Sequence, residues 1–158
     1  MGSTSVKISA ALSSVKRLYV DVAPLIYYIE EHPLYVERME QVISLIENTP
    51  IVAVSSAISL TEVLHQPILR GRIDLEQSYQ TILLSGNTFR LYPVTGKIAV
   101  SADHLRARYN LKTPDALHVA TALELRCDAF ITNDKGLRRV TEIAVLVVGE
   151  LEVDSPPS

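Results

Sequence analysis

The sequence predicts an α/β fold, a three-layer α/β/α sandwich whose central, mostly parallel sheet has about five strands. The first observation behind this prediction is a set of short β-rich segments that are nearly continuous in apolar residues, at 17–21, 51–55, 89–94, 129–133 and 144–149. Strands that are buried on both faces have this composition. The second observation is that helical patterns separate most of these segments, as in sheets whose parallel strands are joined by crossover helices.

The helices follow from apolar spacing and from turn residues, taken in chain order. One stripe of apolar side chains at helical spacing runs through 35–46, and a second runs through 98–109. Asp74 followed by Gln77 is typical of a capping box, with Gly86 as the stop signal. In 113–127, Thr113 suits the N-cap, Pro114 suits the first turn and almost every later position is apolar, so this helix is expected to be buried.

The length and composition favour one globular domain. The 158 residues are about one domain in length, and a hydrophobic content of 47% is ample for a packed core. We place the domain at 17–150, with 1–16 as a flexible leader and 151–158 as a flexible tail. The net charge of −3 excludes a broadly basic nucleic-acid coat, so only local basic patches are left to contact RNA or DNA.

The expected location is the cytoplasm, with no attachment to a membrane. No apolar stretch approaches the roughly 20 residues of a membrane span, and residues 1–16 lack the apolar centre of a secretory signal. The single cysteine, Cys127, has no partner for an internal disulfide and fits a reducing compartment.

Four acidic residues fall where an α/β sheet places its ligands. Asp21 closes the first strand, Asp134 follows the fourth, Glu62 lies in the helix after the second strand, and Asp115 opens the buried helix. Ligands of open α/β sheets lie beyond the carboxyl ends of the strands, where the strand order reverses, so all four side chains are expected at one edge. Each acid alone also has an ordinary explanation: turns for the two strand-end residues, the helix dipole for Asp115, and for Glu62 a solvated polar row with Ser55, Ser59 and Gln66.

Together the four carboxylates predict a metal site. They would repel one another and raise one another's pKa values unless a cation neutralised them. Oxygen ligands select hard cations, so Mg²⁺ or Mn²⁺ is expected. Such a cation activates water and steadies charge on phosphate oxygens, which is the chemistry of phosphodiester hydrolysis. Asp21 then interrupts its apolar strand because the sheet is a rigid mount for a metal ligand.

The segments around these acids resemble the PIN-domain ribonucleases, most closely the toxin half of VapBC toxin–antitoxin pairs. LYVDVAPLIYYIEEHP (18–33) is similar to the opening strand and helix of the family, SLTEVL (59–64) to its second block, and KTPDALHVATALELRCDAFITND (112–134) to the third and fourth. Val22 departs from the pattern, because many relatives carry a small hydroxyl residue after the first Asp.

The resemblance implies a function and a set of residues. On it, the catalytic and metal-binding residues are Asp21, Glu62, Asp115 and Asp134, and Thr132 orients a carboxylate or a bound water through a hydrogen bond. It further implies a parallel sheet between helices, RNA cleavage that depends on Mg²⁺ or Mn²⁺, a small antitoxin partner and a homodimer. Lys135, Arg138 and Arg139 follow Asp134 and fit either phosphate binding or a solvated cluster. With Arg106, Arg108 and Lys112, they are the local basic residues left to meet RNA phosphates.

Two alternatives to the nuclease stay open at this point. His65 and His118 each follow an acid by three residues, which is the spacing found in carboxylate-bridged di-iron bundles, although the strand segments argue against a bundle. Without such a role, His118 is expected to pack within its helix. The second alternative is a catalytically inactive PIN fold that binds other proteins, and the presence of all four acids argues against it.

Overall fold

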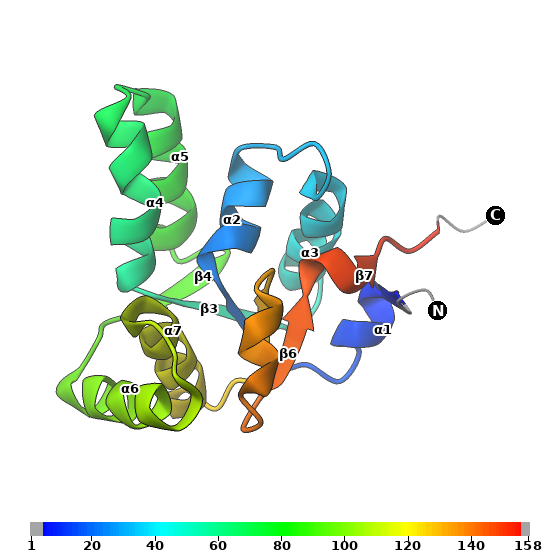
Figure 1. The fold of residues 1–158 in the computed structure, drawn as a ribbon. Coiled ribbons are helices and arrows are strands. Elements are labelled where there is room, and N and C mark those ends of the chain that lie inside the picture. The colour runs from blue at the N-terminus through cyan, green and yellow to red at the C-terminus, as the bar shows by residue number, and fades with distance from the viewer. Residues whose placement is uncertain (1–4, 156–158) are drawn as a thin grey trace.

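The computed structural model describes residues 5–155 and confirms the predicted fold class (Figure 1). The main sheet has five strands, all parallel, in the order β4-β3-β2-β5-β6. Their bounds are β2 (Arg17–Val20), β3 (Val52–Ser56), β4 (Phe89–Tyr92), β5 (Ala129–Thr132) and β6 (Ala144–Val147). Each strand overlaps one of the five apolar segments, because a buried parallel strand needs apolar side chains on both of its faces.

Helices cover both faces of this sheet and form the outer two layers. The α-helices are α1 (Ile8–Leu12), α2 (Val22–Ile29), α3 (Val36–Asn48), α4 (Ile58–Leu69), α5 (Ile73–Leu84), α6 (Gly96–Tyr109) and α7 (Thr113–Glu124), and two 3₁₀ helices are η1 (Lys135–Arg139) and η2 (Val148–Glu150). In Figure 1, α4 and α5 lie side by side as a hairpin, and α6 and α7 form a second pair. Within residues 5–155, no helix is both long and apolar enough to cross a membrane.

Alternate residues of each strand enter two separate cores. Leu18, Val20 and Ile131 pack in the core that contains side chains of α1 to α5. Tyr19 and Phe130 point to the opposite face and pack against α6, α7 and η1. Because side chains alternate across a strand, one short apolar segment supplies both cores.

The strand order reverses at β2, in the middle of the sheet. The chain runs from β2 outward through β3 to β4, and then returns to pair β5 with the other edge of β2. The carboxyl ends of β2 and β5 therefore flank the crevice where open α/β sheets bind their ligands.

The prediction of a flexible leader at 1–16 and a flexible tail at 151–158 is wrong where these segments form regular structure. Val6–Lys7 forms a strand, β1, that pairs in parallel with β7 (Leu151–Glu152). Ile8 and Leu12, four residues apart, give α1 an apolar face, and both are buried in the core. Residues 1–4 and 156–158 of the predicted leader and tail lie outside the described residues.

Two details of the helix ends also differ from prediction. Asp74 does not cap α5, since the N-cap is Arg72, whose guanidinium instead donates to the Asp74 carboxylate. Helix α7 begins one residue earlier than predicted, with Lys112 as the N-cap and Pro114 in the first turn. The helix stripes at 35–46 and 98–109 are confirmed by buried residues of α3 and α6.

Candidate active site

Asp21 is held at the carboxyl end of the central strand by three hydrogen bonds. Its backbone N–H donates to the carbonyl of Ile131 on β5 (3.0 Å). It is the N-cap of α2, and its Oδ1 accepts from the N–H of Val22 (2.8 Å). Its Oδ2 accepts from the hydroxyl of Thr132 (2.8 Å). The apolar run around Asp21 is thus interrupted where a strand changes into a helix, and the carboxylate is fixed in orientation.

Thr132 connects Asp21 to Asp134 across the ends of β2 and β5. While its hydroxyl donates to Asp21, the same oxygen accepts from the backbone N–H of Asp134 (3.1 Å). Asp134 is the N-cap of η1, and its Oδ1 accepts from the N–H of Gly136 (2.8 Å). A Cβ at position 136 would lie 3.0 Å from that oxygen, so glycine allows this close approach.

Asp115 reaches the same cleft from the first turn of α7 and is partly buried. Burial raises the pKa of its carboxyl above the ordinary value, and the negative charges of Asp21, Asp134 and Glu62 raise it further, while His118 opposes them. The predicted convergence of the four acids therefore appears in the structure as mutual repulsion felt at Asp115.

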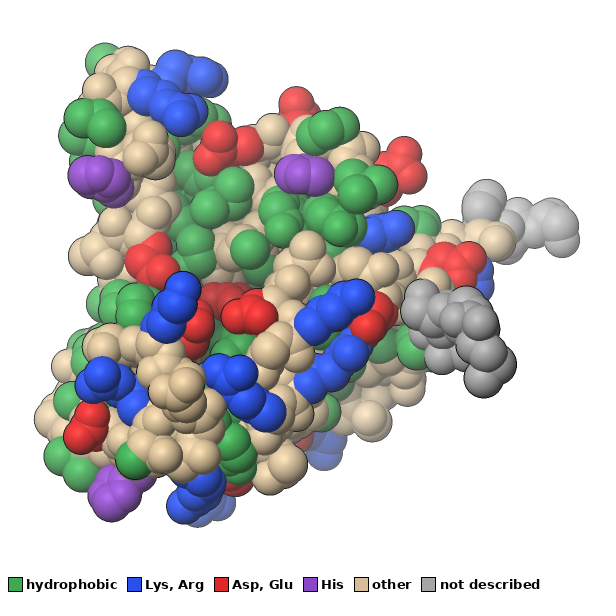
Figure 2. Space-filling view, viewed as in Figure 1, with side chains coloured by type: hydrophobic (Ala, Val, Ile, Leu, Met, Phe, Trp, Pro, Cys, Tyr) green, Lys and Arg blue, Asp and Glu red, His purple; other side chains and the backbone are tan. Residues whose placement is uncertain are grey.

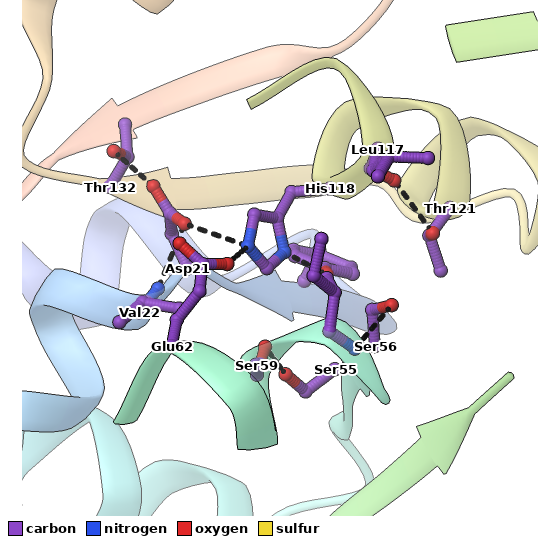
Figure 3. Close-up of polar contacts among 12 residues, drawn as sticks. Asp21, Val22, Ser55, Ser56, Ser59, Glu62, Leu117, His118, Thr121 and Thr132 are labelled. Carbon is purple, nitrogen blue, oxygen red and sulfur yellow. Dashed lines mark hydrogen bonds and ion pairs between the residues drawn. The ribbon is translucent and has the colours of Figure 1, made fainter. Parts of the chain in front are cut away.

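Glu62 enters the cleft from α4 and contacts a buried histidine. Its side chain is 32% exposed, and its Oε1 lies 2.5 Å from Nε2 of His118, which is 1% exposed. The same nitrogen lies 3.9 Å from Oδ1 of Asp21. Figure 3 shows both carboxylates directed toward one nitrogen of the His118 ring.

His118 does more than pack within its helix, which corrects the prediction from sequence. Its Nδ1 lies 2.6 Å from the hydroxyl of Tyr19 on β2, so the ring connects α7 to the central strand as well as to α4. Burial raises the pKa of Tyr19 well above its usual range, and the nearby Asp21 carboxylate adds to this. The tyrosine therefore keeps its proton. His65, with the same spacing from an acid, is exposed on α4.

The polar row that contains Glu62 is only partly a solvated face. Ser55 and Ser59 are buried, and their hydroxyl groups lie 2.8 Å apart, whereas Gln66 is exposed. Ser55 belongs to the end of β3, where it meets Ser59 in the first turn of α4, so the end of the row nearest the sheet is buried. Helical spacing identified the shared face but not what covers it.

The four acids line one cavity of about 350 Å³. Its other walls come from Thr132, Asn133 and mainly apolar side chains at the start of α2. Figure 2 shows acidic side chains in the hollow at the centre of this face, with Lys and Arg side chains on its rim. A larger and more apolar cavity of about 700 Å³ lies along α6 and the start of α7. It contains none of the four acids, so we assign the chemistry to the smaller one.

The donor atoms of the cleft fit a hard divalent cation, although they are not assembled around one. All four candidate ligands supply carboxylate oxygen, and burial together with the neighbouring carboxylates raises the pKa of Asp115, so a cation in the cleft would stabilise its charged form. Within residues 5–155, no three His, Cys, Asp or Glu side chains are arranged to hold a metal ion as they stand. Binding would therefore need the carboxylates to draw closer together around the cation.

Most of the basic residues near the cleft already have partners. Ion pairs join Arg106 to Asp103, Arg108 to Glu142, and Arg138 to Glu150. Arg139 donates to the backbone carbonyl of Asn110 (3.1 Å). In the described part of the chain, Lys112 and Lys135 form no ion pair, and both are exposed. Of the six basic residues, these two therefore have no ion pair to break before they contact a phosphate.

The comparisons with known proteins agree with this geometry. The chain matches the family model of the PIN domain over residues 18–143, and it therefore belongs to the PIN domain family. No curated protein sequence matches it. The di-iron alternative is not supported, because residues 5–155 form a five-stranded sheet between helices instead of a four-helix bundle, and His65 is exposed.

Solved structures share the fold at low sequence identity. VapBC2 from Rickettsia felis, bound to a DNA fragment from its promoter, is 18% identical, with 83% of this chain and 98% of that chain covered and a TM-score of 0.65. A toxin–antitoxin complex from Klebsiella pneumoniae is 23% identical, with coverages of 83% and 97% and a TM-score of 0.63. VapC20 from Mycobacterium tuberculosis, a toxin that cleaves the sarcin-ricin loop, is 14% identical, with coverages of 78% and 95% and a TM-score of 0.64.

Proposed function

We propose that this protein is a metal-dependent endoribonuclease and the toxin of a toxin–antitoxin pair. The observation that carries the proposal is the convergence of Asp21, Glu62, Asp115 and Asp134 on one cavity at the reversal point of a PIN-domain sheet. Similar folds that act as toxins or occur in toxin–antitoxin complexes support the choice of RNA as substrate and of a toxin role.

Each residue has a role that follows from its contacts. Asp21 would hold the cation with a carboxylate fixed by Val22 and Thr132, and Asp134 would do so from the start of η1. Glu62 and Asp115 would complete the ligand set from the facing helices. When bound, Mg²⁺ or Mn²⁺ supplies the positive charge that activates water and stabilises the phosphate oxygens.

The direct test is cleavage of defined RNAs by the purified chain across a titration of Mg²⁺ or Mn²⁺. We expect cleavage that rises with the metal, stops in EDTA and is lost in Asp134→Asn. The matched control is Asp103→Asn, since Asp103 is exposed on α6 and outside the cleft. Full activity in EDTA would overturn the metal-dependent mechanism.

We extend the proposal to a small antitoxin partner. Large apolar side chains are exposed at the connection between α4 and α5, namely Ile68, Leu69 and Ile73, which lies along α4 beyond Glu62. A partner segment with apolar side chains would cover this surface, and its arginine or lysine would pair with the cleft acids in place of the metal. Inhibition should then weaken as the metal concentration rises.

The partner is tested by expression with and without the neighbouring reading frame, followed by copurification and RNA cleavage. If no partner copurifies and expression does not slow growth, the toxin role fails while the nuclease stands on its own test. We also expect the protein to be cytoplasmic and to form a homodimer. Light scattering after gel filtration measures the molar mass and so checks the dimer. A folded protein that cuts no RNA in any metal but binds a partner would favour the alternative, an inactive PIN-fold interaction module.

A further inference from the structure

We infer that His118 is a positioning residue that holds the Glu62 carboxylate in the cleft, and that Tyr19 fixes the imidazole ring for this task. The inference deepens the proposed function, because it rests on Glu62 being a metal ligand. It explains how an acid in the middle of α4 can belong to a site whose other acids lie at strand ends and in the first turn of α7.

Glu62 has more freedom than the acids at the strand ends. Asp21 and Asp134 are N-caps whose carboxylates accept backbone hydrogen bonds. The longer Glu62 side chain is 32% exposed on α4, and its hydrogen bond among the described residues is to His118. Without that bond it would sample solvent-facing rotamers, and confining it to the cleft would cost side-chain entropy.

The direction of the hydrogen bonds follows from chemistry. An ionised carboxylate only accepts, so Nε2 of His118 carries the hydrogen that is donated to Glu62. In the neutral ring Nδ1 is then an acceptor, and the hydroxyl of Tyr19 donates to it. Tyr19 is itself fixed, since it is fully buried and stacks on Phe130 with ring centroids 5.0 Å apart.

This arrangement leaves Glu62 able to bind a cation. Only Oε1 of Glu62 is engaged by the ring, and within residues 5–155 no hydrogen bond uses Oε2. The donated N–H also lies between Glu62 and Asp21, 3.9 Å from the latter, and so offsets repulsion between the two carboxylates. Groups that orient a ligating carboxylate in this way typically change metal affinity by about 10- to 100-fold when they are removed.

Two substitutions at one position separate positioning from packing. The side-chain amide of His118→Gln extends as far as Nε2 and can still donate to Glu62, whereas that of His118→Asn ends near Nδ1 and can contact only Tyr19. Both remove the same buried ring. His65→Gln is the matched control, because His65 follows Glu62 at the same spacing but is exposed.

The measurement is Mn²⁺ binding to the full chain, followed by the EPR signal of free Mn²⁺, with thermal unfolding in EDTA as the check on folding. We expect His118→Gln to bind within about threefold of the wild type, as for a weakened neutral hydrogen bond. We expect His118→Asn to bind about 10- to 100-fold more weakly. His65→Gln should bind as the wild type does. Tyr19→Phe keeps the packing and should weaken binding by about 2- to 10-fold, which tests the inference if His118→Asn does not fold.

The outcomes separate this inference from the proposed function. Equal losses in the Gln and Asn variants, or unchanged binding in His118→Asn, would overturn the positioning role and leave the metal site in place. A wild-type protein that binds no Mn²⁺ would overturn the metal-dependent function itself. The positioning role is supported if His118→Asn binds Mn²⁺ more weakly than His118→Gln does while the two variants unfold at similar temperatures.

Discussion

The two walls of the cleft hold their acids by different means. In the strand wall, formed by Asp21, Thr132 and Asp134, the backbone does the holding through helix caps and the ends of β2 and β5. In the helix wall, formed by Glu62, Asp115 and His118, the acids come from α4 and α7, and a side chain from one helix fixes a side chain on the other. The strand wall is therefore built by the same bonds that form the fold, whereas the helix wall depends on a contact between two helices.

This difference predicts how stability and activity separate. A change in the strand wall that keeps its hydrogen bonds should affect chemistry alone, and a change that breaks them should affect both chemistry and folding. In the helix wall, removal of the Asp115 charge should stabilise the metal-free protein, because burial and the neighbouring carboxylates both disfavour that charge.

The largest expected effect is the loss of RNA cleavage in Asp21→Asn and Asp115→Asn. Each should lower the rate by at least about 100-fold, since losing a metal ligand removes several kcal/mol of stabilisation from the transition state. Asp21→Asn should stay folded, because the Asn side-chain oxygen can still accept from the N–H of Val22 and cap the helix, while the bond donated by Thr132 is lost. Cleavage with Mg²⁺ and urea unfolding in EDTA measure the two effects. A folded Asp115→Asn protein with full activity would contradict the assignment.

The next largest effect is expected from a substitution that removes two hydrogen bonds of the strand wall. Thr132→Val removes the hydroxyl that donates to Asp21 and accepts from the backbone N–H of Asp134. Leaving these groups unpaired should lower the free energy of unfolding by about 1–3 kcal/mol and reduce cleavage as well. Thr132→Ser keeps the hydroxyl and should lose much less of either. Urea unfolding of the pair compares them, and equal stability of Val and Ser variants would show that the bridge contributes nothing.

The pH dependence of stability tests the role of Asp115 in the helix wall. The folded-state pKa of Asp115 is raised above its ordinary value of 3.8, so the folded protein binds this proton more tightly than the unfolded chain does. The resulting stability is fully present below pH 3.8 and is lost as the pH rises through the raised pKa. In EDTA, the wild type should therefore lose stability over this range relative to Asp115→Asn. Urea midpoints of the two proteins across the range provide the test, and parallel curves would contradict it.

The smallest effect concerns RNA contact at the rim of each wall. Lys135 follows the strand wall and Lys112 precedes α7, and neither forms an ion pair with a described residue. Changing either to Gln should reduce the salt slope of single-stranded RNA binding by about 0.7 per lost phosphate contact. Arg106→Gln is the control, because Arg106 is paired with Asp103. Fluorescence anisotropy at several salt concentrations measures the slopes. A wild-type slope several times larger than the change caused by either lysine substitution would mean that many more basic residues contact the RNA.

The strand wall was more accessible to sequence reasoning than the helix wall. Asp21 and Asp134 stand out because they end or follow short apolar segments, and the sheet places such positions at one edge. Glu62 and His118 lie on separate helices, and helical spacing indicates a face but not the element opposite it. The contact between α4 and α7 depends on how the chain crosses the sheet, so the role of His118 emerged only from the structure.

Short elements at the two ends of the described chain were missed for a different reason. Strands of two residues, such as β1 and β7, are too short to show an alternating pattern. The available signal was the pair Ile8 and Leu12, four residues apart, which marks one apolar face over a single turn of helix. Five residues rarely form a helix without tertiary packing. The spacing of the two residues alone therefore did not predict a helix, and the helix became evident only from its packing in the structure.

The pairing of β1 with β7 also has a consequence for the order of folding. Val6 aligns with Leu151, so the first described strand cannot complete its pairing until the last has been synthesised. Contacts of such large sequence separation form slowly, because the intervening chain must first be closed into a loop. During synthesis, the acidic cleft at the ends of β2 and β5 would therefore be assembled before β1 had paired with β7.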